Sequence, residues 1–352
     1  MKSATSIWSR LADVAGLVAT PLALADYVAL VSPHDGHARV DAVHDEIAGV
    51  RTLTLRPPRG WRPHRAGQHV TVQLAVDGRL ATRTYSISSA ATAARHITIT
   101  VKAQGRVSRA LVRDVKPGAH LAIGPASGDF VLSARHPQRS LFITAGSGIT
   151  PIASMVRTLA AQGNVPDVAH VHYARSPRDV IFGDELRALA AAHPGYRLTI
   201  VHTRDDPRRF CAERLDELVA DWRAREAWAC GPASLLASVI DCFERAGRSA
   251  ALRVERFAAV LAPVPPTATG GRVRFATSRM EARADGRTPL LRVAESAGVN
   301  APHGCRMGIC HSCDARLVSG SVRDLRTGEL AEAGARVQIC VCAAAGDVEL
   351  AL

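Results

Sequence analysis

The chain has 352 residues, of which 47% are hydrophobic and 22% charged, enough for two or three domains that each bury a core. Its 44 Lys and Arg residues exceed its 32 Asp and Glu residues by 12, a surplus that suits an anionic surface or an acidic protein partner. Nucleic-acid binding is not expected, because no run of five basic residues occurs and aromatic residues make up only 4% of the chain.

Residues 1–38 form an N-terminal segment whose middle part, residues 11–31, is mostly apolar. A secretory signal peptide and a membrane-spanning helix are two ways to interpret it. Asp13 and Pro21 interrupt the apolar run, and Asp13 and Asp26 would lie in hydrocarbon if the segment crossed a bilayer. The sequence therefore predicts a helical segment that packs on the protein, with peripheral contact to the cytoplasmic membrane face as the alternative.

Residues 39–136 predict an antiparallel β-barrel. Stretches such as Arg51–Leu55 and Val70–Leu74 alternate polar and apolar side chains, as half-buried strands do. Glycine and proline separate these stretches at short intervals, for example in Pro57-Pro58 and Pro117-Gly118. Several short strands at this spacing are typical of an antiparallel barrel.

From residue 137 the pattern changes to strands that alternate with helices. This alternation predicts a parallel sheet with crossover helices over residues 137–257. Residues 258–271 contain three prolines and end in two glycines, a composition that predicts a linker. A compact third domain, residues 272–352, follows, so the chain is expected to be multidomain.

Four cysteines of the third domain have the spacing of ligands to a plant-type [2Fe–2S] cluster: Cys305, Cys310, Cys313 and, after a gap, Cys340. A zinc site usually repeats the C-x2-C pair, which occurs once here, and a disulfide framework belongs to small secreted domains. The spacing therefore predicts that these four residues bind iron. The other cysteines are scattered, as in a reduced, cytoplasmic protein: Cys211, Cys230, Cys242 and Cys342.

The stretch Arg83-Thr84-Tyr85-Ser86 offers three groups that a flavin requires. These are a cation for its phosphate, an aromatic ring against the isoalloxazine, and a hydroxyl near its reactive nitrogen. Alternation along a strand puts Arg83 and Tyr85 on one face and Ser86 on the other, unless the strand bends. A half-exposed strand without a ligand is the alternative interpretation of this stretch.

A glycine turn that opens a helix follows at residues 105–108. Backbone N–H groups at a helix N-terminus can bind a pyrophosphate, and the Ser108 hydroxyl can assist them. Gly105, Val107 and Ser108 are therefore candidate contacts to the nucleotide part of a flavin. A capped helix start without a ligand is the alternative.

A dinucleotide loop is predicted where the first strand of the parallel sheet leads into a helix, at residues 146–151. Gly146 and Gly148 permit close approach of the backbone to a ligand, and Pro151 suits the first helical turn. The motif departs from G-x-G-x-x-G by ending in proline, so an ordinary strand–helix turn is the alternative. The expected contacts are Gly146, Gly148, Thr150 and Pro151.

Side chains that follow the next strands complete the expected nucleotide site, because ligands bind at the carboxyl ends of parallel strands. Arg175, Ser176 and Arg204 offer cations and a hydroxyl for a ribose 2′-phosphate, which predicts NADPH, with NADH as the alternative. Cys230-Gly231-Pro232 ends the last strand, where a small polarizable side chain suits a place beside the nicotinamide. A buried structural cysteine is the alternative for Cys230.

In their order along residues 39–352, these motifs resemble the ferredoxin–NADP reductase superfamily fused to a C-terminal plant-type ferredoxin domain. The resemblance implies an FAD-binding antiparallel β-barrel, an NAD(P)-binding α/β domain with a parallel sheet, and an α+β ferredoxin domain of the β-grasp type. It also implies FAD rather than FMN, with Tyr85, Ser86 and Cys230 as the catalytic residues. Glu255–Phe257 resembles the end of the reductase module, where an acid or an aromatic ring approaches the flavin.

The resemblance also implies that Cys340, and not the nearby Cys342, is the fourth iron ligand. Strand alternation would point both side chains to the same face, so the spacing of the cysteines alone does not separate them. The number of residues that separate Cys340 from Asp347-Val348 is similar to that in the family. We therefore expect Cys340 to bind iron and Cys342 to lie beside the site.

The resemblance implies an NADPH-dependent oxidoreductase that passes electrons through FAD and the cluster to a separate oxygen-activating protein. The leading segment resembles that of reductases serving stearoyl-CoA Δ9-desaturases, so a membrane-bound di-iron fatty acyl-CoA desaturase is the expected acceptor. The alternatives are the reductase component of a soluble aromatic-ring or acyl-CoA oxygenase, and a non-turnover iron–sulfur subunit of a larger complex. The 26 residues between Cys313 and Cys340 argue against the last. The need for a nucleotide and reduced thiols predicts a cytoplasmic location.

Overall fold

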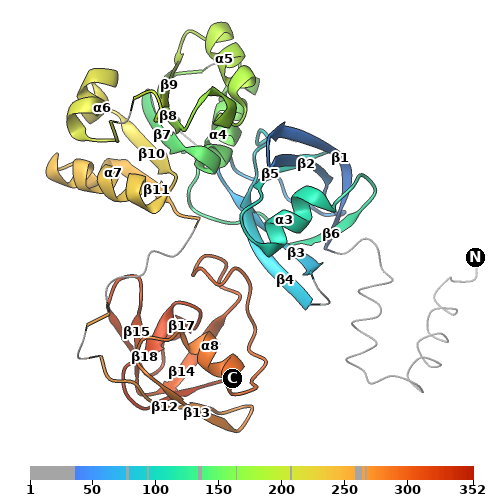
Figure 1. Cartoon of the computed structure of the whole chain (residues 1–352), viewed down its shortest axis with the longest axis vertical. Coiled ribbons are helices and arrows are strands. Elements are labelled where there is room, and N and C mark those ends of the chain that lie inside the picture. The colour runs from blue at the N-terminus through green and yellow to red at the C-terminus, as the bar shows by residue number, and fades with distance from the viewer. Residues whose placement is uncertain are drawn as a thin grey trace, which may run out of the picture.

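The computed structural model describes residues 36–76, 79–92, 95–133, 137–163, 165–206, 208–257, 264–265 and 268–352. Three units follow one another along the chain, coloured blue to cyan, green to yellow, and orange to red in Figure 1. The predicted N-terminal helical segment and most of the predicted linker lie outside the described residues. Among the helices of the described ranges, none has the length and apolar character that a bilayer crossing requires.

The first unit consists of the following strands and one helix: β1 (His37–Ile47), β2 (Val50–Arg56), β3 (His69–Val76), β4 (Arg79–Ser86), β5 (Ile97–Lys102), α3 (Arg106–Arg113) and β6 (His120–Ile123). The strands form one antiparallel sheet in the order β4-β3-β6-β1-β2-β5. A bridge between Ile87 and Ile99 joins the chain after β4 to β5, so the two edges of the sheet meet and the predicted barrel closes. Alternate side chains such as Leu53 and Val72 fill its interior.

The second unit alternates strands with helices and short 3₁₀ turns: β7 (Arg139–Ala145), η1 (Gly146–Gly148), α4 (Ile149–Ala161), β8 (Asp167–Ala174), η2 (Pro177–Asp179), α5 (Gly183–Ala192), β9 (Tyr196–His202), α6 (Ala212–Leu218), η3 (Trp222–Ala224), β10 (Glu226–Cys230), α7 (Ala233–Arg245), η4 (Ser249–Ala251) and β11 (Leu252–Glu255). The sheet is parallel, in the order β11-β10-β7-β8-β9. From β7 the chain builds one side of the sheet and then crosses to the other. The carboxyl ends of β7 and β10 therefore form the switch point at which such sheets bind ligands.

Helix α4 attaches the second unit to the first (Figure 1). The Ser154 hydroxyl donates to the Ser89 carbonyl at 2.6 Å, and Arg157 Nη1 donates to the Ser88 carbonyl at 2.5 Å. Both carbonyls lie just after β4, so these bonds fix the end of that strand against the sheet of the second unit. Apolar side chains of both units pack in one cluster, among them Ala66, Phe130, Leu132, Phe142, Ile152 and Met155.

The third unit begins at the last residue of the predicted linker and comprises β12 (Gly271–Phe275), β13 (Met280–Ala284), α8 (Leu290–Ser296), β14 (Asp314–Ser319), β15 (Ser321–Asp324), β16 (Leu330–Glu332), β17 (Arg336–Gln338), β18 (Cys342–Ala344) and β19 (Val348–Leu350). Its larger sheet is mixed, in the order β13-β12-β19-β14-β17, and a small sheet has the order β16-β15-β18. Leu290, Leu291 and Ala294 of α8 pack in one core with Phe275 and Leu317 of the larger sheet. This is the α+β arrangement expected from the resemblance.

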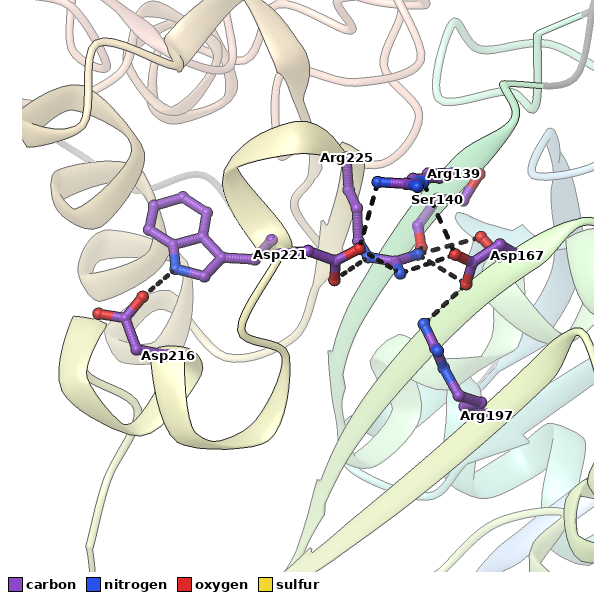
Figure 2. A network of polar contacts seen from close by, with 8 residues as sticks. Arg139, Ser140, Asp167, Arg197, Asp216, Asp221 and Arg225 are labelled. Carbon is purple, nitrogen blue, oxygen red and sulfur yellow. Dashed lines mark hydrogen bonds and ion pairs between the residues drawn. The ribbon is translucent and has the colours of Figure 1, made fainter.

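A buried arginine ties together the amino ends of three strands of the second unit (Figure 2). Arg225 is 1% exposed, and its guanidinium donates to the Ser140 carbonyl, to both carboxylate oxygens of Asp167 and to both of Asp221, at 2.8–3.1 Å. Arg197 adds a further ion pair to Asp167 at 2.7 Å. Each nitrogen of the buried guanidinium thus donates to at least one oxygen, and these bonds offset the cost of removing the cation from water.

We predict that Arg225→Ala destabilises the α/β unit by about 3 kcal/mol, because Asp167, Asp221 and the Ser140 carbonyl lose their shared donor. The measurement is the calorimetric unfolding transition of this unit. The matched control is Arg245→Ala, whose side chain is 79% exposed and pairs with Asp241 on the surface. Equal effects of the two substitutions would show that the buried network does not stabilise the sheet.

Candidate functional site

The residues proposed for the flavin line one cavity of about 280 Å³. It lies between β4, the start of α3 and the switch point of the second unit. Its wall contains every flavin-contact residue predicted from the sequence, together with Thr150, which was predicted as a dinucleotide contact: Arg83, Tyr85, Ser86, Gly105, Val107, Ser108 and Thr150. Two separate sequence motifs, at residues 83–86 and 105–108, thus form a single site.

The four consecutive residues 83–86 all line this cavity. Ser86 still pairs with His69 on β3, but Ile87 already bridges to Ile99 on β5. Directly after Ser86 the chain thus begins to pair with β5. Tyr85 is half-buried in the wall, and desolvation raises the pKa of the phenol well above its usual value.

The turn before α3 is closed by Ser108. Its hydroxyl oxygen accepts the N–H groups of Gln104 and Gly105, at 3.0 and 2.9 Å, and its proton points to the Gly105 carbonyl at 3.1 Å. The hydroxyl thus shapes the turn at which the backbone N–H groups of the helix N-terminus lie. These N–H groups, rather than a free serine hydroxyl, are what the turn offers to a phosphate.

The predicted dinucleotide loop forms the turn η1 between two further cavities of about 300 and 600 Å³. Gly146 lines both, and Gly148, Gly231 and Pro232 line the smaller one. A Cβ atom on Gly148 would lie 2.1 Å from the Cys230 carbonyl oxygen, so only glycine allows β7 and β10 to end this close together. Pro151 is buried in the first turn of α4 and does not contribute to these walls.

Cys230 is fully buried, and its side chain is not part of either cavity wall. It pairs in register with Glu255 on the neighbouring strand. Burial raises the pKa of the Cys230 thiol well above its usual value, and burial raises the pKa of Glu255 to about 7. At this end of the sheet the Cys230 thiol is therefore neutral, and the Glu255 carboxyl binds a proton at a higher pH than an exposed glutamate does. Such a thiol is a packing group and a poor nucleophile.

Of the arginines that follow β8 and β9, only some line the larger cavity. Arg175 lines it, but its guanidinium is paired with Asp179, which also accepts the Ser176 hydroxyl at 2.7 Å. Arg204 bonds through its backbone to the Arg175 carbonyl, and its side chain is not in the wall. Arg209, which the sequence analysis did not select, lines the cavity and has no acidic partner among the described residues.

The four predicted iron ligands converge at one end of the third unit, and backbone N–H groups point at their sulfurs. Cys305 N donates to Cys310 Sγ at 3.1 Å, and Cys310 N and Met307 N donate to Cys305 Sγ at 3.4 Å. Gly308 N donates to Cys340 Sγ at 3.3 Å. Such N–H···S bonds stabilise anionic sulfur, which is the state in which cysteine binds iron.

The cysteines are arranged as two neighbouring pairs, Cys305 with Cys310 and Cys313 with Cys340. In each pair the contact between the sulfurs lowers the pKa of one thiol, Cys310 or Cys313, and raises the pKa of its partner. A Cβ atom on Gly304 would lie 2.6 Å from Cys310 Sγ, so the loop can wrap the sulfurs only with glycine there. Two pairs of converging thiols fit a two-iron cluster. Within the ranges that the structure describes, no three His, Cys, Asp or Glu side chains group as the ligands of one metal ion would.

Cys342 lies apart from these pairs. It begins β18, opposite Asp324 on β15, and its burial raises the pKa of the thiol to about 12. Cys340 instead lies in the turn before the strand, where alternation of faces does not apply. The structure thus directs Cys340 to the loop that carries the other three cysteines.

The flavin cavity and the cluster loop meet. Met307, which lies between Cys305 and Cys310, forms part of the cavity wall together with Phe257 at the end of the second unit. Phe257 also lines the smaller nucleotide cavity, so it lies where the flavin and nucleotide cavities adjoin. The sequence carried no signal for Met307, because its role depends on how the third unit packs against the first. For Arg209 the signal was the basic pair Arg208-Arg209 after the end of β9.

Three domain-family models match the chain in this order: an oxidoreductase FAD-binding domain over residues 50–132, an oxidoreductase NAD-binding domain over residues 142–239, and a 2Fe-2S iron–sulfur cluster binding domain over residues 275–345. They agree with the flavin cavity, the two nucleotide cavities and the paired cysteines. The protein is therefore an oxidoreductase that binds FAD, a nicotinamide dinucleotide and a [2Fe–2S] cluster.

A protein named NADPH oxidoreductase from Mycobacterium tuberculosis is 44% identical, over 97% of this chain and 92% of its own length. The stachydrine N-demethylase reductase subunit Stc4 of Rhizobium meliloti is 32% identical, over 82% of this chain and 87% of its own length. The crystal structure of phthalate dioxygenase reductase is 25% identical and superposes with a TM-score of 0.65, over 90% of this chain and 97% of that one. The chain therefore belongs to the ferredoxin–NADP reductase superfamily, as a flavoprotein fused to a C-terminal plant-type [2Fe–2S] ferredoxin domain.

Proposed function

We propose that this protein passes electrons from NADPH through FAD and the [2Fe–2S] cluster to a separate oxygen-activating protein. The observation that carries the proposal is Met307, which places the cluster loop in the wall of the flavin cavity. A nicotinamide gives two electrons together and an iron–sulfur cluster accepts one, so a flavin between them is the necessary converter. An electron leaving the flavin cavity meets the cluster loop directly.

Within this proposal each sequence motif has a defined task. Arg83, Tyr85 and Ser86 hold the flavin, and the turn at residues 105–108 binds its pyrophosphate. The turn η1, with Gly231 and Pro232, binds the nicotinamide end of the dinucleotide. Cys230 packs behind this turn as a buried neutral thiol. Thr150 contacts the flavin side of the switch point, and Pro151 shapes the start of α4. Cys305, Cys310, Cys313 and Cys340 hold the two irons.

The proposed domain boundaries are those of the sequence analysis, with residues 258–271 as the linker before the ferredoxin domain. The proposed location is the cytoplasm, and peripheral membrane contact through residues 1–38 is the alternative.

The same N-terminal segment bears on the acceptor, because its resemblance to reductases of acyl-CoA desaturases is what favours a membrane-bound desaturase. A relative that is named as a glycine betaine monooxygenase reductase subunit, 30% identical, favours a separate oxygenase component instead.

The acceptor can be identified by coupling the protein to both kinds of partner. We expect purified protein and NADPH to support oleoyl product formation in membranes carrying a stearoyl-CoA Δ9-desaturase, supplied with stearoyl-CoA and oxygen. Cys310→Ser should abolish the product, because the cluster cannot assemble without this ligand, while Cys342→Ala should retain it. Absence of product with the desaturase, alongside turnover with a soluble oxygenase component, would reject the desaturase and keep the electron-transfer function.

The coenzyme preference is expected to depend on Arg209. As a cation without an acidic partner in the larger cavity, it suits a ribose 2′-phosphate better than Arg175, which Asp179 already neutralises. Arg209→Ala should raise the KM for NADPH about tenfold and leave that for NADH unchanged, since a charged hydrogen bond contributes about 1.5–3 kcal/mol. Arg208→Ala is the matched control, because Arg208 pairs with Asp206 and Glu217. An equal change for both coenzymes would exclude a role in phosphate recognition.

Glu255 should make stability depend on pH in a defined window. Burial raises its pKa from 4.5 to about 7 in the folded protein, so folding favours the protonated carboxyl. The stability that this group contributes is complete below about pH 4.5 and is lost as the pH rises through about 7. Glu255→Gln should therefore become more stable relative to wild type as the pH rises through this window, measured as the difference in thermal midpoint.

The control for this experiment is Glu244→Gln, at an exposed position on α7. Its difference from wild type should not change with pH across the same window. A constant difference for Glu255→Gln as well would show that the Glu255 carboxyl ionises normally in the folded protein.

A further inference from the structure

Arg326 connects the cluster loop to the turn after β15. Its Nη1 donates to the Gly308 carbonyl at 2.9 Å. Its Nε and Nη2 donate to the two carboxylate oxygens of Asp324, at 3.1 and 2.6 Å, and its backbone N–H donates to the same carboxylate at 2.8 Å. Arg326 is thus a fixed fork, held on one side by Asp324 and bonded on the other to a residue of the cluster loop.

Gly308, the residue that Arg326 bonds, is the donor to the fourth cluster cysteine. Its N–H points at Cys340 Sγ at 3.3 Å. Its φ of +68° lies in the left-handed region, and a Cβ atom there would lie 2.7 Å from Arg326 Nη1 and 3.0 Å from a Val341 methyl carbon. The backbone of Gly308 is therefore held between Arg326 and Val341, and this position aims its N–H at the sulfur.

The turn that carries Arg326 is itself attached to the segment that carries Cys340. Leu325 N donates to the Val341 carbonyl at 2.8 Å, and Asp324 pairs with Cys342 in the β15–β18 ladder. A closed circuit of contacts thus runs from Gly308 to Cys340, along the chain to Val341, across to Leu325, and through Arg326 back to Gly308. Within this circuit, the Arg326–Gly308 bond can be removed by replacing the Arg326 side chain, which is not a cluster ligand.

We propose that Arg326 is a positioning residue that sets the reduction potential of the [2Fe–2S] centre by holding the Gly308 N–H on the Cys340 sulfur. The inference rests on the proposed ligand role of Cys340. Reduction adds one negative charge to the centre, and an N–H dipole aimed at a ligand sulfur stabilises the more negative state. Loss of this bond should therefore make the centre harder to reduce.

An effect of charge on the potential can be separated from an effect of positioning. Asp324 and Arg326 form an ion pair that carries no net charge, so both residues can be replaced together without changing the charge near the cluster. The double variant Asp324→Asn/Arg326→Gln keeps the net charge of the pair at zero and keeps an acceptor for the backbone N–H of residue 326. It removes only the fork that reaches Gly308. The matched control is Arg323→Gln, which removes a comparable bond from Arg323 Nη1 to the Gly328 carbonyl, at 2.9 Å, in the same hairpin.

The experiment is a redox titration of the full-length holoprotein, with the reduced cluster followed by electron paramagnetic resonance. We expect the midpoint potential of the double variant to be more negative than that of the wild type, while Arg323→Gln has the wild-type potential. The rate of flavin reduction by NADPH should be the same in all three proteins, since no flavin contact is altered. A wild-type midpoint potential in the double variant would overturn the proposal.

Arg326→Lys keeps the proposal testable if the double variant fails to assemble a cluster. The lysine retains the positive charge beside Asp324 but lacks the planar fork that serves both partners. Under the proposal its midpoint potential is again more negative than wild type, and a wild-type value would show that charge, not positioning, is what matters. Absence of a [2Fe–2S] signal in the wild-type protein would instead refute the ligand assignment itself.

Discussion

The packing of α4 against the chain just after β4 is the contact on which the functional arrangement depends. Ser154 and Arg157 bond the carbonyls of Ser89 and Ser88, which lie three and two residues beyond Ser86, the end of the flavin stretch. The same helix begins at the dinucleotide loop. One rigid element therefore sets the distance between the residues proposed for the flavin and those proposed for the nicotinamide. Hydride transfer requires this separation to be short and constant.

The cluster loop of the third unit extends this arrangement. Met307 lies in the flavin cavity wall, while its own N–H and that of Gly308 donate to the sulfurs of Cys305 and Cys340. One short loop thus faces the electron donor on one side and surrounds the electron acceptor on the other. Because the side chains that hold this loop, such as Arg326, lie outside both cofactor sites, they can adjust the cluster without altering the flavin.

Much of this organisation could be predicted from the sequence, because local patterns carried it. The strand and helix periodicities predicted the barrel and the parallel sheet, and the cysteine spacing predicted the residues that converge. What the sequence could not show were contacts between residues that are distant in sequence. Strand alternation alone puts Arg83 and Ser86 on opposite faces, and only the structure shows that both line one cavity. Likewise Arg204 was preferred to Arg209, although only the latter lines the nucleotide cavity.

The central claim is that electrons reach the cluster from NADPH only by way of the flavin, within one molecule. Anaerobic stopped-flow mixing of the holoprotein with NADPH tests it most directly, by following flavin bleaching and the cluster absorbance together. The account predicts that flavin bleaching comes first and that cluster reduction follows at a rate independent of protein concentration. A flavin that is reduced while the cluster stays oxidised, or a cluster rate that rises with protein concentration, would contradict it.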